Sequence, residues 1–434
     1  MHQLLKLKQT VQLSQHNITC TVEQFLGGGG QGEVYKATLN GKAVALKWYF
    51  AEQATQEQQQ SIEELIKKGA PTTNFLWPID IATAKGIKGF GYIMPLREAR
   101  YKSLFDLMKR RAEPTFSALI TAAYQLAENF YQLHGKGLCY RDISHGNIFF
   151  DPQTGEILIC DNDNVSVNGT DKTGVYGTPR FMAPEIVRAE AKPNTQTDLF
   201  SLAVLLFYML MMHHPLEGKK ESDIKCFDLP AMNKLYGFEP VFIFDPQNNS
   251  NQPVVGYHDN ALIYWPLYPQ FLRDLFVKAF TDGLNNTNNR IRESEWRFAL
   301  IRLRDSIVYC QHCHSENFAD AQQNQAQKIC WNCQKPFSLP VKLSVNNQVI
   351  MLNANTQLFA HHLDPNRKYD FTQPLAIMQQ HPQNPNIWGL KNLSTTTWQI
   401  TTADGTVKVV EPQRSVALNL GTIINFGIVE GHFV

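Results

Sequence analysis

The segment that most restricts the possible folds of this chain is a polar loop enclosed by apolar residues. Residues 138–150 read LCYRDISHGNIFF, so Asp142 and Asn147 lie between two apolar runs. Apolar flanks of this kind favour buried strands, which would hold the loop rigidly between them. We therefore expect a mixed helix and strand fold in which this loop presents a carboxylate and an amide side chain at a fixed spacing.

Changes in composition divide the chain into three expected domains. Its 434 residues indicate more than one domain, because single hydrophobic cores stop growing near ~250–300 residues. Residues 1–308 alternate strand-like and helix-like stretches, and residues 309–338 hold four paired cysteines. Residues 339–434 contain short runs rich in Thr, Val, Ile, Asn and Gly, which predict a small all-β sandwich.

Charge and hydropathy exclude several classes of partner. The chain carries 40 basic and 39 acidic residues, so nothing indicates binding to nucleic acid or to an anionic membrane. The longest nearly apolar run, Leu199 to Met212, is shorter than the ~20 residues that span a bilayer and predicts a buried core helix. Scattered single cysteines and a start without an apolar signal segment favour a cytoplasmic location.

A glycine-rich stretch lies near the start of the first segment. Gly27, Gly29, Gly32 and Val34 fit the spacing G-x-G-x-x-G-x-V. Glycines let backbone N–H groups approach phosphate oxygens, because no Cβ atom stands in the way. Alone, the motif also fits a flexible turn between strands. Here it leads into a strand and not into a helix, which disfavours a dinucleotide-binding fingerprint.

Three more motifs follow in a fixed order. Residues 44–47 read VALK, one predicted hairpin after the glycines, and residues 157–164 read ILICDNDN. Residues 176–185 read YGTPRFMAPE. Together with the polar loop, this series resembles the protein kinase family of the Ser/Thr type over residues 18–305. The resemblance implies a two-lobed α+β fold that binds ATP and Mg²⁺ and transfers phosphate to hydroxyl groups of protein substrates.

The resemblance assigns nucleotide-binding roles to residues of the first half. Lys47 would bind the phosphates together with the glycine-rich stretch, and Met94 would lie where adenine is contacted. The helix expected after this strand would supply a glutamate that holds Lys47. Glu63 is the favoured candidate, with Glu64 and Glu57 as alternatives, because most glutamates on such a helix are simply solvated.

The resemblance assigns the chemistry to residues of the following loops. Asp142 would accept the proton of the attacking hydroxyl, and Asn147 and Asp161 would supply oxygen ligands to Mg²⁺. Tyr140 stands where the family usually has His, which is a change in packing. Ser144 stands where a lysine usually contacts the transferred phosphoryl group, and the lost charge allows slow or unusual catalysis.

The tripeptide Asp161-Asn162-Asp163 departs from the family's D-F-G. Asn162 replaces the Phe that packs into the core, and Asp163 replaces the flexible Gly. These changes put the usual inward–outward switch of this segment in doubt without removing the metal ligand. Asp163 is itself a candidate additional ligand.

Further motifs predict contacts within the second lobe. Thr178 stands where Ser/Thr kinases place a threonine against the catalytic aspartate, which favours serine and threonine as acceptors. Asp198 would accept hydrogen bonds from the catalytic-loop backbone, and Arg290 would form a buried ion pair with Glu185. Thr170, Thr173 and Tyr176 are candidate phosphorylation sites with Arg141 as the phosphate's partner, and an unmodified polar loop is an equal alternative.

Two cysteine pairs follow the kinase-like segment. They have the form C-x2-C…C-x2-C with sixteen intervening residues, which predicts four thiolates around Zn²⁺, from Cys310, Cys313, Cys330 and Cys333. Four protein ligands leave no open position, so we expect a structural zinc ribbon. Two disulfides are the competing interpretation, and they need an oxidising compartment that nothing in the sequence indicates.

The last segment loosely resembles the later strands of forkhead-associated domains, which bind phosphothreonine. The resemblance rests on residues 386–394, NIWGLKNLS, and residues 421–427, GTIINFG. The Gly-Arg and Ser-x-x-His elements of the phosphate pocket are not apparent, and residues 359–363 read FAHHL there. We therefore expect a β-sandwich used for protein contact, as a degenerate forkhead-associated-like domain.

The zinc ribbon and the Asp-Asn-Asp tripeptide resemble kinases of bacterial phosphorylation triads associated with tellurium resistance. That resemblance implies a metal-dependent protein phosphatase and a von Willebrand A-type protein as partners. An alternative function is a nucleotide-binding pseudokinase scaffold, which Ser144 and Asn162 favour and the retained Lys47 and Asp142 oppose. A small-molecule kinase is disfavoured by residues 177–185, which in protein kinases help to form the peptide platform.

Overall fold

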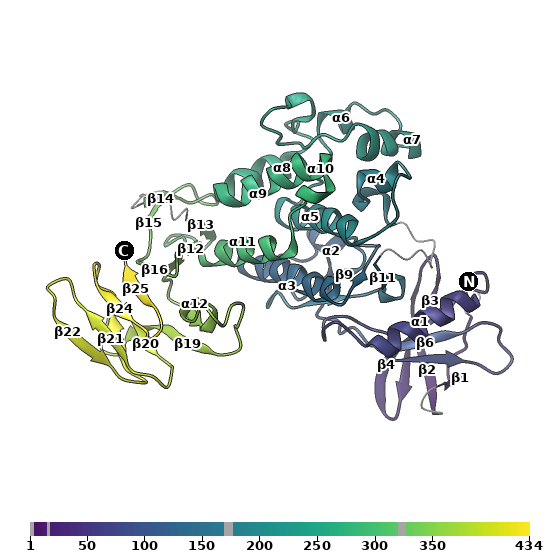
Figure 1. The fold of residues 1–434 in the computed structure, drawn as a ribbon, viewed down its shortest axis with the longest axis horizontal. Helices are drawn as coiled ribbons and strands as arrows, with labels where there is room; N and C mark the ends of the chain where they lie inside the picture. The colour runs from purple at the N-terminus through teal and green to yellow at the C-terminus, as the bar shows by residue number, and fades with distance from the viewer. Residues whose placement is uncertain (1–3, 15–17, 169–176, 320–326) are drawn as a thin grey trace. The chain divides into compact units, whose positions relative to one another are not determined.

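The computed structural model describes residues 4–14, 18–168, 177–319 and 327–434. The chain divides into two compact units. Figure 1 shows the ribbon with its helices and strands labelled. The first unit is Met1–Trp265 with Arg273–Arg297, and the second is Pro266–Leu272 with Phe298–Val434. The domain boundaries expected from composition stay a prediction.

The first lobe of the first unit is a closed barrel of six antiparallel strands. In barrel order they are β1 (Thr10–Leu13), β2 (Thr19–Gly28), β3 (Gly32–Leu39), β4 (Lys42–Tyr49), β6 (Gly91–Pro95) and β5 (Asp80–Thr83). Strands β3 and β4 join at Asn40 and Gly41, which both have positive φ, as the two-residue turn predicts. Alternate side chains fill the barrel, among them Val22, Tyr35 and Leu46. The expected hairpin is therefore confirmed.

Helix α1 (Gln56–Lys68) follows β4 and precedes β5 in the chain. Thr55 begins it by accepting a hydrogen bond from the N–H of Gln58, and Gly69, with φ of 70°, ends it. Its buried side chains are Ser61, Ile62 and Leu65. This spacing gives one apolar face, so the register of the helix is set by burial.

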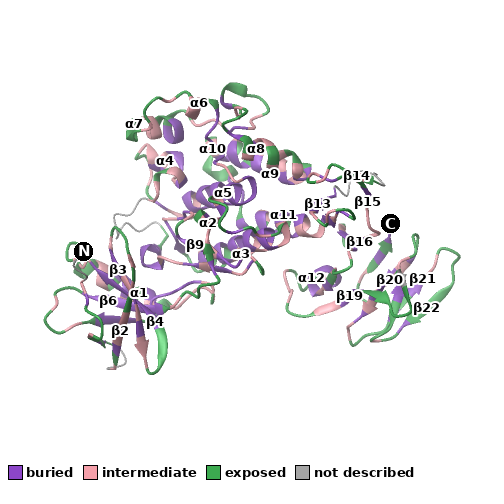
Figure 2. Ribbon diagram, turned by 180° about the vertical axis from the view of Figure 1, so that it is seen from behind, coloured by how far each residue is buried: buried purple, intermediate pink, exposed green. Residues whose placement is uncertain are grey.

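The second lobe is mainly helical. Its longest helices are α3 (Phe116–Gly135), α5 (Thr195–Met211), α9 (Gln270–Phe280) and α11 (Glu293–Asp305), of which α9 and α11 extend into the second unit. Shorter helices are α2 (Leu104–Met108), α4 (Pro184–Val187), α6 (Lys219–Ser222), α7 (Leu229–Asn233), α8 (Asp259–Tyr264) and α10 (Asp282–Asn285). Figure 2 shows α5 coloured as buried along its length, which confirms the expected core helix. None of the described helices is long and apolar enough to cross a membrane.

Short strands frame the polar loop. Strands β8 (Leu138–Cys139) and β9 (Ile148–Phe150) lie on its two sides, as the apolar flanks predict. Strand β9 pairs with β10 (Ile157–Ile159) and β7 (Lys102–Ser103), and β8 pairs with β11 (Ser166–Val167). Because β9 and β10 are antiparallel neighbours, the residues after β10 return to the loop that precedes β9.

The second unit contains two short hairpins followed by two antiparallel sheets. The hairpins are β12 (Ile307–Tyr309) with β13 (Glu316–Phe318), and β14 (Gln327–Ile329) with β15 (Pro336–Ser338). The six-stranded sheet has the order β17 (Gln348–Met351), β16 (Lys342–Val345), β25 (Glu430–Phe433), β24 (Ile423–Asn425), β21 (Trp398–Thr401), β22 (Val407–Val410). The four-stranded sheet has the order β18 (Gln357–Phe359), β19 (Pro374–His381), β20 (Asn384–Asn392), β23 (Ser415–Ala417), and α12 (Ala360–Leu363) follows β18.

Both sheets share one hydrophobic core. Leu343 and Trp398 come from the six-stranded sheet, and Leu358 and Leu390 come from the four-stranded sheet. The strand content expected after residue 339 is therefore confirmed. The histidines of FAHHL lie on α12 and are buried, and His362 lies 3.5 Å from Asp305 at the end of α11.

Candidate active site

A cleft of about 760 Å³ lies in the first unit beside the glycine-rich stretch. Most of the sequence-predicted nucleotide-site residues line it, namely Gly27, Gly29, Gly32, Val34, Lys47, Met94, Asp142, Asn147 and Asp161. A Cβ atom at Gly32 would lie 2.2 Å from the carbonyl oxygen of Trp48. This close approach explains why glycine is required where β3 begins.

Lys47 is buried and forms ion pairs with two carboxylates. Its Nζ lies 2.7 Å from Oδ2 of Asp163 and 3.4 Å from Oδ1 of Asp161. It also donates a hydrogen bond of 3.0 Å to Oε1 of Gln31, at the tip of the glycine-rich stretch. Burial alone would lower the pKa of Lys47, but the carboxylates of Asp163 and Asp161 outweigh it and raise the pKa. The ammonium group therefore stays charged in the cleft.

The structure corrects the expected partner of Lys47. Glu63 accepts a hydrogen bond of 3.1 Å from Gln59, one turn earlier on α1, and does not pair with the lysine. The reason is the helix register: Ile62 and Leu65 occupy the buried face, and Glu63 lies about 100° around the helix from Ile62. Glu63 is half-buried and lies outside the buried face of the helix.

The polar loop between β8 and β9 holds Asp142 between two donors. Oδ1 of Asp142 accepts a hydrogen bond of 2.7 Å from the Thr178 hydroxyl, and Nδ2 of Asn147 lies 3.2 Å from Oδ2. Asp198 fixes the loop backbone, because its carboxylate accepts hydrogen bonds from the N–H groups of Tyr140 at 2.6 Å and Arg141 at 3.0 Å. The structure thus brings the predicted catalytic aspartate, amide and threonine together.

The Asp-Asn-Asp tripeptide forms a tight turn. Asp161 has φ of 49°, and η1 (Asn162–Asn164) follows it. The fully buried Asn162 donates hydrogen bonds to the carbonyls of Leu76 at 3.0 Å and Ile159 at 2.9 Å. An amide held by two backbone acceptors takes the place of the packed Phe, so the turn is fixed in one orientation.

The two aspartates of the turn point to different surroundings. The side chain of Asp161 is 45% exposed toward the cleft, whereas that of Asp163 is fully buried against Lys47. Desolvation, opposed by Lys47 and supported by Asp163, raises the pKa of Asp161. Asp161 is therefore the carboxylate of the pair that a metal ion in the cleft could reach.

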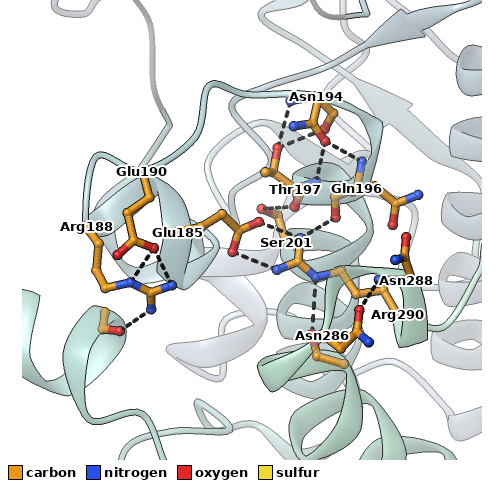
Figure 3. A network of polar contacts seen from close by, with 12 residues as sticks. Glu185, Arg188, Glu190, Asn194, Gln196, Thr197, Ser201, Asn286, Asn288 and Arg290 are labelled. Atoms are coloured by element: carbon orange, nitrogen blue, oxygen red, sulfur yellow. Dashed lines mark hydrogen bonds and ion pairs between the residues drawn. The ribbon is translucent and has the colours of Figure 1, made fainter.

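A network of polar contacts holds Glu185, the last residue of the motif that ends in MAPE (Figure 3). Arg290 makes two parallel hydrogen bonds of 2.8 Å to the carboxylate of Glu185, and a third of 2.8 Å to the carbonyl of Gln196. Both charged side chains are largely buried. The predicted buried pair is therefore present. Thr170, Thr173 and Tyr176, the candidate phosphorylation sites, lie outside the described residues.

The four paired cysteines of the second unit form a separate cluster. The sulfur atoms of Cys310, Cys313, Cys330 and Cys333 all lie within 4.8 Å of one another. The distances Cys310–Cys333 and Cys313–Cys330 are both 3.6 Å, far beyond the ~2.05 Å of a disulfide. A tetrahedron with Zn–S bonds of about 2.3 Å has S···S edges of about 3.8 Å. The cluster therefore has the geometry of a four-thiolate metal site.

Groups around the sulfur atoms also fit bound thiolates. The N–H of His312 donates to Sγ of Cys310 at 3.4 Å, and the Asn317 amide lies 3.6 Å from Sγ of Cys330. The ring of His312 contacts the carbonyl of Pro336 instead of joining the cluster. These contacts orient the sulfur atoms and would stabilise negative charge on them.

This chain has a β-barrel lobe, a helical lobe and a cleft between them. These are the features of the two-lobed kinase folds. The chain belongs to the protein kinase family, because the protein kinase domain pattern matches residues 20–254, more than half of the 434 residues. Membership of this family implies ATP and Mg²⁺ as the molecules bound in the cleft.

Known kinases are similar over the same region. Mitogen-activated protein kinase kinase kinase 7 of Drosophila melanogaster is 26% identical over 205 residues, covering 46% of this chain and 29% of that protein. Serine/threonine-protein kinase plk-2 of Caenorhabditis elegans is 26% identical over 214 residues, covering 45% and 31%. Dual specificity protein kinase shkB of Dictyostelium discoideum is 23% identical over 282 residues, covering 62% and 38%. The chain thus matches less than two fifths of the length of each of these relatives.

Sequence reasoning missed two residues in the surroundings of Lys47. The Tyr49 hydroxyl donates to Oδ2 of Asp163, and Gln31 reaches the lysine from the glycine-rich stretch. Tyr49 follows Lys47 by two residues in the same strand, so both side chains lie on one face of β4. The alternation of side chains along β4 could therefore have predicted that Tyr49 lies near Lys47. Nothing local in the sequence indicates that Gln31 contacts Lys47.

Proposed function

We propose that this chain is an ATP-dependent protein kinase that transfers the γ-phosphoryl group to serine or threonine hydroxyls of protein substrates. The observation that carries the proposal is the contact between Thr178 and Asp142 in the cleft. The carboxylate is held with one oxygen on the threonine and the other toward Asn147. A substrate hydroxyl placed beside this carboxylate would be oriented and would lose its proton to it.

The other residues of the cleft divide the remaining work. Lys47 and the backbone N–H groups of the glycine-rich stretch would hold the phosphates of ATP, and Met94 on β6 would contact the adenine. Asn147 and Asp161 offer the oxygen ligands for Mg²⁺, which would neutralise the phosphate charge when bound. Each of these side chains lines the same cavity, so one nucleotide can contact all of them.

The test is phosphate transfer from γ-labelled ATP to a protein substrate. Wild type is expected to label the substrate, and Asp142→Asn is expected to lose nearly all of the label, because the amide cannot accept the hydroxyl proton. Asp404→Asn makes the same chemical change on an exposed turn of the second unit and should label like wild type. Equal labelling by wild type and Asp142→Asn would overturn the catalytic assignment.

A nucleotide-binding scaffold without phosphoryl transfer is the second candidate function. The observation that favours it is Ser144, which is buried in the catalytic loop where the related kinases carry a cation. The same labelling experiment separates the two functions. A scaffold would bind Mg-ATP and leave the substrate unlabelled in wild type and in Asp142→Asn alike.

The finer proposals concern the second unit and the partners. Zinc in the four-cysteine cluster would be structural, since all four positions of a tetrahedron are taken by the chain.

The zinc ribbon and the Asp-Asn-Asp tripeptide support a place in a bacterial phosphorylation triad with a metal-dependent phosphatase and a von Willebrand A-type protein. The two-sheet domain would then serve protein contact as a forkhead-associated-like sandwich. Mixing the purified proteins and measuring complex formation by gel filtration tests these partners, and separate elution would reject them.

A further inference from the structure

The carboxylate that holds Lys47 comes from the turn after β10 and not from helix α1. We propose that Asp163 is the positioning residue of Lys47, in place of the helix glutamate that the family pattern assigns to this role. The proposal rests on the proposed function, because it names the residue that keeps the phosphate-binding lysine in the cleft. Asp163 acts through Lys47 and contacts no substrate itself.

The geometry makes Asp163 the stronger of the two partners of Lys47. Its Oδ2 lies 2.7 Å from Nζ of Lys47, and the distance from Asp161 is 3.4 Å. The Asp163 side chain is fully buried, and only 6% of the Lys47 side chain is exposed. A close pair in such surroundings is screened little by water, so the carboxylate fixes the ammonium group in one place.

Tyrosine hydroxyls complete the surroundings of this carboxylate. Tyr49 donates its hydroxyl hydrogen to Oδ2 of Asp163, and Gln58 of α1 donates to the Tyr49 hydroxyl at 3.1 Å. Desolvation and then the charge of Asp163 raise the pKa of Tyr92, whose ring lies 6.0 Å from that of Tyr49. Along this route the helix reaches the ion pair through a neutral amide and a hydroxyl.

This arrangement has a consequence for how the site is assembled. Asp161, the proposed metal ligand, and Asp163, the partner of Lys47, lie two residues apart in one turn. Asn162 between them is held by two backbone carbonyls, so the turn places both carboxylates at once. The position of Lys47 is thus coupled to the metal-binding turn, and moving α1 would not by itself release the lysine.

The test measures how closely the Lys47 amine approaches the phosphates of a bound nucleotide. An acyl-phosphate derivative of ATP transfers its acyl group to a lysine held beside the phosphates, and mass spectrometry of the labelled peptide gives the rate. The full-length chain is compared as wild type, Asp163→Asn and Glu63→Gln at saturating probe, so that nucleotide affinity does not enter. Because Asp163 raises the pKa of Lys47, rates are measured over a range of pH and compared at equal fractions of neutral amine. Asp163→Asn should lower the rate at least tenfold, and Glu63→Gln should stay within about twofold of wild type.

Three results would overturn the proposal. The first is an unchanged acylation rate in Asp163→Asn. The second is a faster rate in Asp163→Asn, which would mean that the ion pair holds the lysine away from the nucleotide. The third is a lower rate in Glu63→Gln. Folding of each variant is checked by thermal melting. If Asp163→Asn does not fold, Tyr49→Phe decides, because it removes the hydroxyl donor and leaves the carboxylate. Tyr49→Phe should lower the rate about threefold, and an unchanged rate would overturn the proposal.

The acylation rate keeps this proposal separate from the proposed function. It depends on where Lys47 lies and not on transfer to a substrate. If wild type binds the probe but transfers no phosphate, the proposed function fails while the comparison of Asp163→Asn with Glu63→Gln still holds. A merely structural role for Asp163 would lower the melting temperature and leave the rate of the folded molecules at the wild-type value.

Discussion

The hydroxyl of Tyr140 donates a hydrogen bond to the backbone carbonyl of Cys160, the residue that precedes Asp161. This bond joins the start of the catalytic loop to the end of the strand that delivers the metal-ligand candidate. Tyr140 is fully buried, and its phenol replaces the imidazole of the family pattern. The phenol at this position therefore links the two segments by a hydrogen bond.

Loss of that link should cost stability. Tyr140→Phe leaves the Cys160 carbonyl without its donor in a buried place, and we expect the free energy of unfolding to fall by about 1–2 kcal/mol. Urea unfolding of wild type and Tyr140→Phe measures the difference. A free energy within error of wild type would show that the bond contributes nothing to stability.

The two ion pairs in Figure 3 should differ sharply in their contribution to stability. Glu185→Gln leaves Arg290 charged and largely buried without its partner, which we expect to destabilise the fold by about 3–5 kcal/mol. Glu190→Gln removes the exposed partner of Arg188 and should change little. Melting temperatures of the two variants test this difference, and a similar loss in both would contradict it.

Stability should depend on pH through His134. The imidazole lies between the carboxylates of Asp198 and Glu293. Burial alone would lower its pKa, but the two carboxylates outweigh burial and raise the pKa of His134 to about 9. The folded-state pKa is therefore above the ordinary 6.5, so the stabilisation is complete below pH 6.5 and is lost as the pH rises through about 9.

The size of this effect follows from the shift in the pKa of His134. It corresponds to about 3 kcal/mol at most, since each pKa unit is worth ~1.4 kcal/mol. Urea unfolding at pH 6 and at pH 9.5 should show a larger loss in wild type than in His134→Gln, which cannot titrate. Equal losses in the two proteins would exclude His134 as the cause.

The cysteine cluster should bind one zinc ion per chain. Cys330→Ser removes one of four thiolates from the cluster and should abolish stoichiometric zinc, measured by elemental analysis of the purified protein. Cys226→Ser changes an exposed cysteine outside the cluster and serves as the control. Full zinc content in Cys330→Ser would refute ligation by four thiolates.

The sequence was most informative where one short segment determines a local geometry. The apolar flanks of the loop around Asp142 predicted β8 and β9, and the resemblance to protein kinases implied that Lys47, Asp142 and Asp161 meet in one cleft. The pair of Arg290 and Glu185 was predicted across 105 residues because each belongs to its own motif. These features need no knowledge of how distant elements are rotated.

The partner of Lys47 could not be predicted in this way. Its identity depends on how α1 is turned relative to β4, and burial of Ile62 and Leu65 turns Glu63 away from the lysine. The motif therefore indicated that a carboxylate was needed and gave the wrong element. Similarly, the sequence predicted two sheets after residue 339 but could not supply their strand order, which depends on long-range pairing.

The most direct test of the central claim is mass spectrometry of a protein substrate after incubation with the full-length chain, ATP and Mg²⁺. Wild type is expected to place phosphoryl groups on serine or threonine side chains, and Asp142→Asn is expected to place none above background. A substrate that gains no phosphate with wild type, or that gains as much with Asp142→Asn, would contradict the account.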